Sequence, residues 1–582
     1  MALVENMQEE RNRTVKLAAP LRIGIMIDSP QVSRWVAKIL TDIQKSEIAE
    51  VMLVIINDAP RQQPKRSLRE RLRMYWIHGL YNRYTNWDYR SRRATLDAFE
   101  TVDISDLVRT ATTIRVKPTQ KGFVDRFADG DVTRIQEAQL DVLFRFGFRI
   151  IRGEILKCAR YGVWSFHHGD SREYRGAPPG FWEMYERNPV TGTMLQILTD
   201  ELDGGRVIYR SSSATNFESL YLNRNATYWK TAEFALRRLR DLHRYGWEYI
   251  RALPVYNESN HYTKAIYKTP RAPVMIRFLA RQALSWIKNK SRAAFVATRT
   301  QWFIAIRKRE GSRTVLNDTC DFRILKTPKG HFYADPFLIK RGGRNYMFFE
   351  NFKFTAGKAV ISFVELDAAG NCSEPEVALE RDYHLSYPFV FEWRGQVYML
   401  PETKARGSIE LYRAGTFPRQ WTLEKVIVEN VRAVDPTLLE HHGKFWLFAN
   451  IAAEGGDTMD ELHLFYAESP LGPWTPHPQN PVVSDVRRAR PAGSLFLHNG
   501  QLVRPAQDCS LRYGYAMVFN RVEALSETEY REVPFHRIGP EWQRKNLCTH
   551  TYNRSDDYEV LDGMFSAKDL RFRTHGRFED AD

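Results

Sequence analysis

The stretch Ser165–Val207 reads SFHHGDSREYRGAPPGFWEMYERNPVTGTMLQILTDELDGGRV and carries four features in a fixed order. They are a histidine at the end of an apolar run, an Arg-Gly-Ala-x-Pro loop, a Thr-Gly-Thr segment and an Asp-Gly-Gly turn. The apolar run Val163–Phe166 predicts a buried strand that ends at His167. In open α/β sheets, ligands bind beyond the carboxyl ends of the strands, which is where this histidine would lie.

The residues before this stretch predict a parallel sheet. Leu21–Ile27 and Val51–Ile56 are apolar runs typical of buried strands, and Val32–Ile43 between them has apolar residues at helical spacing. A strand, a helix and a strand joined by short links favour parallel pairing. We therefore expect an N-terminal tail at residues 1–19 and an α/β, Rossmann-like domain at residues 20–262.

Three further segments complete the prediction for this domain. Leu140–Phe146 predicts another buried strand, Asp103–Arg109 a short helix and Thr227–Leu253 a long covering helix. The turn at Gly24 lacks a GxGxxG pattern, so the sequence does not indicate a dinucleotide site.

From Asp321 onward, short aromatic and β-branched runs alternate with Gly, Pro and Asn, and they contain an internal repeat. Each copy pairs a first residue with a second one 15 positions later: Asp335 with Glu350, Tyr387 with Glu402, Asp435 with Asn450, and Gly493 with Asp508. The copies start 52, 48 and 58 residues apart, which is about the length of a four-stranded β-propeller blade. With a further strand near Trp302–Arg307 or Asp321–Leu325 and a last sheet around Arg537–Tyr558, we expect an all-β five-bladed propeller at residues 313–582.

Composition is compatible with a multidomain globular protein. The chain has 582 residues, which is too long for one ordinary core. Of these residues, 43% are apolar and 27% are charged, as in ordinary globular proteins. No apolar run approaches the roughly 18 residues of a membrane span, and the N-terminus lacks the pattern of a secretory signal. The five cysteines have no CxxC spacing, which argues against a zinc site or a disulfide scaffold. We expect no metal and a cytoplasmic location.

The net charge of +15 is concentrated in two segments. Residues 61–93 hold ten Lys and Arg against two acids, and residues 271–310 hold ten against one. Such segments attract phosphates of RNA, nucleotide-sugars or anionic lipids, although a solvated face with a linker explains them equally well. We predict a basic amphipathic linker helix at residues 263–312, with Ile276, Leu279, Leu284 and Ile287 on one face. It suits peripheral membrane contact through residues 271–309, or packing between domains.

The ordered features of Ser165–Val207 resemble the catalytic core of the 10-formyltetrahydrofolate-dependent formyltransferases, the family of methionyl-tRNA and sugar formyltransferases. The resemblance implies formyl transfer from 10-formyltetrahydrofolate to an amine, with His167, Asp203 and Ser165 at the catalytic positions. It also implies binding of the formyl donor by Arg175, Gly176, Ala177, Pro179 and Gly204.

The chain departs from this family at Ser165, where the family has Asn, and at Asp170-Ser171-Arg172, where it has Leu-Leu-Pro. A serine hydroxyl donates one hydrogen bond, whereas an Asn amide donates two. Either a water or another group completes the site, or the chemistry differs. His168 is a poor substitute, because adjacent strand residues face opposite sides of a sheet.

The repeats resemble the five-bladed propellers of glycosidases such as the arabinanases and, more loosely, the N-terminal domain of glucosamine inositolphosphorylceramide transferases. The resemblance implies a central sugar-binding pocket lined by Asp335, Glu350, Glu402, Asp435 and Asp508. Tyr387 stands where a glycosidase would place another carboxylate, so a full set of catalytic acids is not evident. The recurring Asp-Pro also fits a role in shaping the blade turn.

Together these features predict an N-formyltransferase that acts on an amino sugar, free, nucleotide-linked or lipid-linked, with the propeller holding the glycan. Two alternatives are a glycan-binding scaffold with a degenerate transferase domain and a propeller-borne glycosidase. A tRNA formyltransferase is favoured by the positive charge alone, and nucleic acid is not an expected partner.

Overall fold

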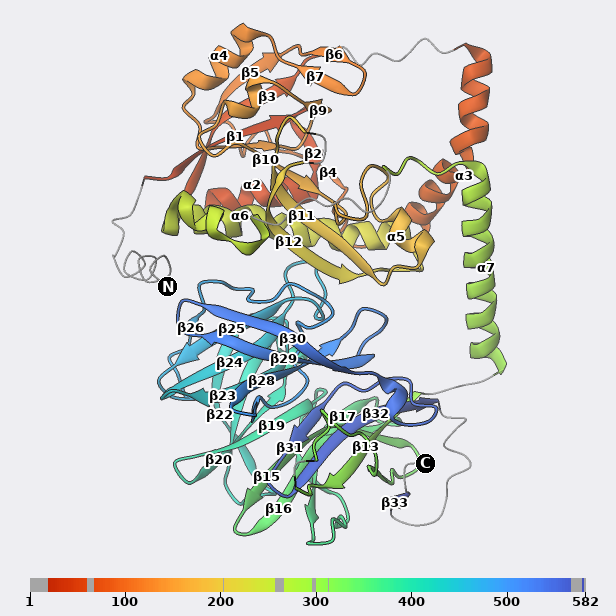
Figure 1. Cartoon of the computed structure of the whole chain (residues 1–582), viewed down its shortest axis with the longest axis vertical. Helices are drawn as coiled ribbons and strands as arrows, with labels where there is room; N and C mark the ends of the chain where they lie inside the picture. The colour runs from red at the N-terminus through yellow and green to blue at the C-terminus, as the bar shows by residue number, and fades with distance from the viewer. Residues whose placement is uncertain are drawn as a thin grey trace. The chain divides into compact units, whose positions relative to one another are not determined.

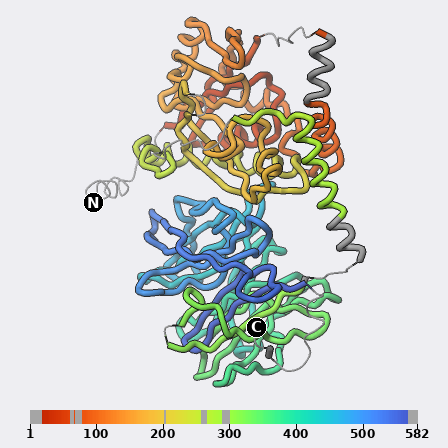
Figure 2. Tube along the Cα trace, turned by 45° about the vertical axis from the view of Figure 1, so that its right-hand side comes forward, coloured from red at the N-terminus to blue at the C-terminus, as the bar shows by residue number. Residues whose placement is uncertain are grey.

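The computed structural model describes residues 19–59, 67–201, 204–256, 266–295, 300–311, 313–566 and 578–579. The chain forms two compact units, coloured red to yellow-green and green to blue in Figures 1 and 2. The first unit extends to Gln282 and the second begins at Ala283, with two short exceptions. Ser212–Ala214 belongs to the second unit and Ala453–Gly456 to the first.

The first unit is built on a seven-stranded sheet of order β12-β11-β10-β8-β1-β3-β5. Its strands are β1 (Leu21–Ile27), β3 (Ala49–Asn57), β5 (Thr112–Val116), β8 (Val142–Arg145), β10 (Val163–His167), β11 (Val190–Ile197) and β12 (Arg206–Ala214). The strands from β5 to β10 pair in parallel, and β11 is antiparallel to β10. The predicted parallel sheet and the strand ending at His167 are therefore confirmed.

Helices cover both faces of this sheet. The helices of the first unit are α2 (Arg34–Ser46), α3 (Leu68–Arg92), α4 (Asp129–Glu137), α5 (Phe181–Glu186) and α6 (Leu220–Ala252), with short 3₁₀ turns η1 (Glu154–Lys157) and η2 (Pro254–Tyr256). Trp35, Ile39 and Ile43 recur at helical spacing in α2 and bury against Phe144 and Trp164 of the sheet. The other face packs on α4 and η1.

The helix predicted at Asp103–Arg109 is wrong. Strand β4 (Thr101–Asp103) pairs with β2 (Gln31–Ser33), and turns follow it. Asp103 Oδ1 accepts a hydrogen bond from the Ser105 backbone N–H at 2.8 Å. This local side-chain bond competes with helix formation, and the helical spacing of the sequence does not reveal it. A small sheet of β6 (Thr119–Lys121), β7 (Val124–Arg126) and β9 (Ile150–Ile151) completes the unit.

The linker helix predicted at residues 263–312 is shorter than expected. Helix α7 spans Ala272–Phe295, and residues 300–308 form strand β13 (Thr300–Lys308). This strand pairs along its whole length with β32 (Tyr558–Ser566). Trp302 to Ile306 are all buried, so burial between distant strands overrides the helical spacing.

Over the residues that the structure describes, the strands of the second unit form five sheets. The first three are β15 (His331–Arg341) to β18 (Glu376–Leu379), β19 (Ser386–Trp393) to β22 (Trp421–Glu429), and β23 (Ala433–His441) to β26 (Thr475–Pro476). Between these ends lie β16 (Arg344–Lys353), β17 (Lys358–Leu366), β20 (Gln396–Glu402), η3 (Lys404–Arg406), β21 (Ser408–Ala414), β24 (Lys444–Ile451) and β25 (Leu462–Ala467). The fourth is β27 (Phe496–His498), β28 (Gln501–Asp508), β29 (Ala516–Leu525) and β30 (Tyr530–Ile538), followed by η4 (Pro540–Trp542). The fifth joins β31 (Tyr552–Arg554) and β32 to β13, β14 (Arg323–Leu325) and β33 (Phe578–Glu579).

Apolar cores join these sheets into a closed ring. One core links the first three sheets, a second links the third to the fourth, a third links the fourth to the fifth, and a fourth links the fifth back to the first. The ring closes within the fifth sheet, where β13 from the start of the unit pairs with β32 near its end. The second unit is a five-bladed propeller, as the repeats predict.

Candidate functional sites

At the carboxyl edge of the first unit's sheet, three neighbouring strands bring polar residues to one face. Ser165 of β10 lies opposite Arg145 of β8 on one side and Gln196 of β11 on the other. Because side chains alternate along a strand, His167 points to the same face as Ser165, one step nearer the strand end. This polar row, Arg145–Ser165–Gln196 with His167, is the first candidate site.

Arg145 holds Ser165 with two hydrogen bonds. Its Nε and Nη2 donate to Ser165 Oγ at 3.1 and 2.9 Å, and its Nη1 donates to the carbonyl of Arg149 at 2.9 Å. Burial lowers the pKa of Arg145, and the nearby carboxylates of Asp125 and Asp28 oppose this shift. Neither Arg145 nor Gln196 was among the predicted site residues; the one signal was an arginine within the apolar run LDVLFRF.

The loop that follows β10 packs closely on His167. Nε2 of His167 lies 3.2 Å from the carbonyl oxygen of Tyr174. A Cβ added at Gly169 would lie 2.9 Å from that carbonyl and 3.3 Å from His167 Nε2, so this position has little room for a side chain. Asp203 lies outside the described residues, and its place in the catalytic set stays a prediction.

His168 is turned away from the polar row, as strand alternation predicts. Its ring stacks on Tyr228 of α6 at 3.5 Å and meets Trp35 of α2 edge-on at 5.5 Å. Burial lowers the pKa of His168 to about 3, so this imidazole stays neutral at physiological pH. It therefore does not replace the missing Asn.

Backbone hydrogen bonds to Tyr267 fix the Arg-Gly-Ala-Pro-Pro loop at residues 175–179. Tyr267 N–H donates to the Arg175 carbonyl at 2.8 Å, and Ala177 N–H donates to the Tyr267 carbonyl at 3.2 Å. Gly176 has φ of 94°, and a Cβ there would lie 2.2 Å from the Tyr267 carbonyl oxygen, so only glycine fits. Nε of Arg224 donates to the Pro179 carbonyl at 2.8 Å. Donor binding by this loop and by Gly204 stays a prediction.

The segment that replaces Leu-Leu-Pro forms an ion pair of its own. Arg172 donates from Nε and Nη2 to the two oxygens of Asp170 at 3.0 and 2.7 Å. A Cβ at Gly192, in the Thr-Gly-Thr segment, would lie 2.9 Å from Asp170, which explains the glycine. The departure from the family pattern is thus a structured turn packed on β11.

The second candidate site lies at the propeller axis, where the repeat acquires a structural meaning. Asp335, Tyr387 and Asp435 have left-handed backbones, with φ of 52°, 47° and 52°, and each sits in a β-bulge ahead of a proline. A left-handed non-glycine residue costs about 1–3 kcal/mol, and bulges redirect side chains. The recurring Asp-Pro therefore both shapes the turn and aims a side chain toward the axis.

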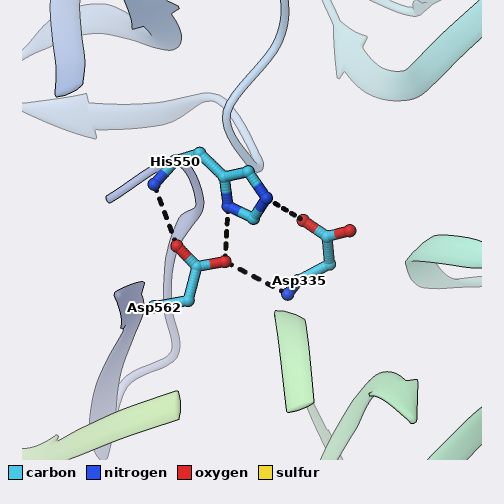
Figure 3. A group of neighbouring side chains, drawn as sticks. All are labelled: Asp335, His550 and Asp562. Atoms are coloured by element: carbon cyan, nitrogen blue, oxygen red, sulfur yellow. Dashed lines mark hydrogen bonds and ion pairs between the residues drawn. The ribbon is translucent and has the colours of Figure 1, made fainter. Parts of the chain in front are cut away.

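The first group at the axis is Asp335, His550 and Asp562 (Figure 3). His550 Nδ1 lies 2.6 Å from Asp562 Oδ2, and its Nε2 lies 3.8 Å from Asp335 Oδ1. The imidazole stacks on Trp302 at 3.9 Å. Burial opposes protonation of His550, but the two carboxylates outweigh it and raise the pKa. Burial raises the pKa of Asp335 to about 6.

These three side chains have ligand atoms within 4.8 Å of one another, a spacing that could hold a metal ion. His550 and Asp562 lie outside the repeat, so the sequence did not single them out. The expectation of no metal stays a prediction.

The second axial group surrounds Arg490. Its Nε donates to Asp435 at 2.6 Å, its Nη2 lies 3.5 Å from Glu402, and its guanidinium lies 4.6 Å from the ring centre of Tyr513. Gln507 Nε2 donates to Asp435 at 2.8 Å. Burial raises the pKa of Asp435 to about 7, with Arg490 lowering it and Glu402 raising it.

The remaining predicted pocket residues divide between two places. Glu350 joins the axial carboxylates: burial, Asp335 and Glu402 raise its pKa well above the usual value, and His384 lies 3.5 Å away. Asp508 accepts hydrogen bonds from the Ser510 hydroxyl at 2.6 Å and from Arg537 at 3.3 Å. The structure therefore brings Asp335, Glu350, Glu402 and Asp435 together and places Asp508 in a different local pair.

The buried Tyr387 takes a bridging role at the axis. Its hydroxyl lies 2.8 Å from the Thr437 hydroxyl and accepts a hydrogen bond from Gly493 N–H at 2.7 Å. It joins the second, third and fourth blades where a glycosidase would carry a carboxylate. Whether the axis holds a complete set of glycosidase acids stays untested, and its absence stays a prediction.

Comparison with known proteins finds relatives for the propeller part of the chain. Residues 314–562 match the protein family described as "Glucosamine inositolphosphorylceramide transferase 1, N-terminal". The chain is 39% identical over 219 residues to glucosamine inositolphosphorylceramide transferase 1 of Oryza sativa subsp. japonica, covering 37% of this chain and 29% of the relative. It is 38% identical over 244 residues to the Arabidopsis thaliana protein of that name, covering 41% and 31%. The chain thus spans less than a third of the length of these relatives.

Solved structures give weaker likenesses. A family 117 glycoside hydrolase from the marine bacterium Zobellia galactanivorans has 13% identity and a TM-score of 0.31, covering 48% of this chain and 95% of that one. Glycinamide ribonucleotide transformylase 1 from Symbiobacterium toebii has 16% identity and a TM-score of 0.23, covering 40% and 87%. The fold assignment therefore stands on the strand pairing. The predicted resemblance to the glucosamine inositolphosphorylceramide transferases is confirmed for the propeller, and the formyltransferase resemblance stays a prediction.

Proposed function

We propose that the protein is a transferase that moves a formyl group from 10-formyltetrahydrofolate to the amine of an amino-sugar conjugate. The observation that carries the proposal is the placement of His167 and Ser165 on one face at the carboxyl edge of a parallel sheet. The match of residues 314–562 to a family whose name includes glucosamine supports an amino sugar as acceptor.

The polar row suits a formyl group as ligand. Ser165, held by Arg145, offers an O–H donor for a carbonyl oxygen, and Gln196 Oε1 is buried with no hydrogen-bond partner among the described residues. In the transfer, the amine lone pair forms the N–C bond while the carbonyl π pair moves onto oxygen, where Ser165 and His167 donate hydrogen bonds. The amine proton passes to Asp203, the role that the family resemblance gives it. As the carbonyl reforms, the bond from carbon to the folate nitrogen breaks; its electron pair stays on that nitrogen, which gains a proton through His167.

We propose that the propeller axis holds the glycan part of the acceptor. Asp335, Glu350, Glu402 and Asp435 gather there with Arg490 and His550, groups that hydrogen-bond sugar hydroxyls and pair with an ammonium group. The relatives' names, which join glucosamine to a ceramide lipid, support a lipid-linked acceptor.

Incubating the full chain with 10-formyltetrahydrofolate and a panel of amino sugars, free, nucleotide-linked and lipid-linked, tests this function. Release of tetrahydrofolate with at least one sugar is the expected result. No release with any amino sugar of the panel contradicts the proposal. If a parallel assay with initiator tRNA is the one that releases tetrahydrofolate, the acceptor is RNA and not a sugar.

A second candidate function is glycan binding by a scaffold whose transferase site is degenerate. It is favoured by one observation, the replacement of the family's Asn by Ser165. Calorimetry that detects glycan binding but no binding of 5-formyltetrahydrofolate would support the scaffold over the transferase.

Helix α7 supports contact with a membrane surface. Ile276, Leu284 and Ile287 are 58%, 66% and 54% exposed, and they share one stripe of the helix with the exposed Ala280 and Ala283. Leu279 lies on the opposite, packed side, which corrects its predicted place on this face. The part of the chain that the structure describes contains no helix long and apolar enough to cross a bilayer.

We propose that this stripe lies on an anionic lipid surface on the cytoplasmic side. The exposed Arg277 and Arg281 flank the stripe, and a basic, apolar helix face of this kind binds the headgroup boundary.

We expect the protein to sediment with vesicles of phosphatidylcholine and phosphatidylglycerol. The variant Ile276→Ser/Leu284→Ser/Ile287→Ser is expected to bind about tenfold or more weakly, because it loses the apolar area that enters the interface. The control Phe123→Ser/Leu423→Ser/Leu497→Ser changes exposed apolar residues elsewhere. Equal sedimentation of the two variants contradicts the assignment.

A further inference from the structure

The hydrogen bonds around Ser165 leave its own proton free to donate. A hydroxyl oxygen has two lone pairs, and Nε and Nη2 of Arg145 donate to Ser165 Oγ at 3.1 and 2.9 Å. No acceptor for the Ser165 proton exists among the described residues. The two hydrogen bonds that Ser165 Oγ accepts fix the orientation of the hydroxyl, and its O–H is directed away from Arg145.

The Arg145 side chain is fixed by backbone carbonyls, and one of its N–H groups has no acceptor among the described residues. Its Nη1 donates to the carbonyls of Phe148 and Arg149 at 3.4 and 2.9 Å. Of its five N–H groups, four are thus used, and the second hydrogen of Nη2 has no acceptor among the described residues. The guanidinium is fixed by backbone carbonyls, which do not move with a side-chain rotamer.

The charge of Arg145 is not cancelled by a direct ion pair within the described part of the chain. Asp125 Oδ2 accepts the Arg149 backbone N–H at 2.9 Å, and Asp28 Oδ1 accepts the Phe148 backbone N–H at 3.1 Å. Both carboxylates are thus engaged with the backbone of the same loop. The positive charge of the guanidinium therefore polarises the Ser165 hydroxyl and strengthens it as a hydrogen-bond donor.

We propose that Arg145 takes over part of the task of the family's Asn: it is a positioning residue that holds Ser165 as a charge-assisted hydrogen-bond donor to the oxyanion of formyl transfer. Ser165 forms no covalent bond; it donates a hydrogen bond as the carbonyl π pair moves onto oxygen. A donor in this position stabilises the transition state more than the bound substrate. This inference rests on the proposed formyl transfer and goes beyond it by explaining why serine is tolerated.

Two side chains of this chain would then share the task that the family gives to one Asn. An Asn amide presents its donors from one side chain, whereas here a serine supplies the O–H and an arginine on the neighbouring strand orients and polarises it. The two positions lie opposite each other in the parallel register of β10 and β8.

A double-mutant cycle with Ser165→Ala and Arg145→Met tests the inference. Each single variant is expected to lower kcat by about 10²–10³ with little change in KM, because the lost bond forms mainly in the transition state. The double variant is expected to be no slower than Ser165→Ala, because Arg145 acts through Ser165. Arg145→Lys keeps the positive charge but not the two parallel hydrogen bonds, so its kcat should lie between those of the wild type and Arg145→Met. This variant also serves as a folded comparison if Arg145→Met fails to fold.

The matched control is Arg22→Met, at the amino end of the same sheet. Arg22 likewise donates from Nε and Nη2, to the carbonyls of Gln139 and Ala138 at 3.1 and 2.9 Å. Its loss should leave kcat unchanged. The Kd for 5-formyltetrahydrofolate, measured by calorimetry, should be unchanged in the Ser165 and Arg145 variants. If Arg145 only maintained the structure of the site, its loss would weaken this binding as well.

The outcomes separate this inference from the proposed function. A wild-type protein without formyl transfer contradicts both. An active wild-type protein whose two substitutions multiply their effects, or whose Arg145→Met variant keeps its kcat, overturns the role of Arg145 alone.

Discussion

Replacing His167 with alanine is expected to abolish detectable formyl transfer. His167 ends β10 on the same face as Ser165, and the proposed mechanism assigns it a hydrogen bond to the oxyanion and the proton for the departing folate nitrogen. Removal of a general acid–base group costs about 10²–10⁴ in rate, and loss of its hydrogen bond to the oxyanion adds to this. Measurement of kcat/KM from tetrahydrofolate release checks the prediction.

The adjacent histidine provides the control for this substitution. His168 stacks on Tyr228 on the opposite face of the sheet, so His168→Gln should change kcat/KM by less than about tenfold. Thermal unfolding of both variants separates loss of chemistry from loss of structure. If His167→Ala keeps full activity, or if His168→Gln is the inactive variant, the site is assigned to the wrong face.

Replacing Arg490 with methionine is expected to destabilise the centre of the propeller by about 3–5 kcal/mol, because it leaves buried carboxylates without their cation. Arg490 and Asp435 are almost fully buried, with Arg490 Nε 2.6 Å from Asp435 Oδ2, and Glu402 lies beside them. Amide hydrogen exchange in β23 and β24 measures this locally. Exchange should become about 10²–10⁴-fold faster.

Two further variants show whether the effect comes from the buried charge. Arg419→Met removes an exposed pair with Glu376 and should cost less than about 1 kcal/mol in the stability of the propeller. Arg490→Met/Asp435→Asn removes both partners and should recover much of the lost stability. Equal effects of Arg490→Met and Arg419→Met contradict the account of the axial group.

The sequence predicted those parts of the fold that depend on local patterns. In the first three copies the offset of 15 residues reflects strand register. The residue just before the first position of each copy pairs with the second position: Ala334 with Glu350, Ser386 with Glu402 and Val434 with Asn450. The strand ending at His167 was likewise visible as an apolar run. Both features follow from side-chain periodicity, which a single sequence displays.

The partners that complete each site could not be predicted, because they arise from pairing between distant segments. Arg145 stands 20 residues from Ser165 and reaches it only through the parallel register of β8 and β10. Arg490 and His550 lie outside the repeated positions and enter the axis from connecting loops. Such contacts depend on the closed fold, and spacing along the chain does not reveal them.

Transfer of a ¹³C-labelled formyl group from 10-formyltetrahydrofolate to an amino-sugar conjugate, followed by mass spectrometry and NMR of the sugar, tests the central claim most directly. The account predicts a new N-formyl carbon on the sugar amine with wild-type protein and none with His167→Ala. Label that never reaches a sugar amine, with folded protein and the free, nucleotide-linked and lipid-linked acceptors, would contradict it.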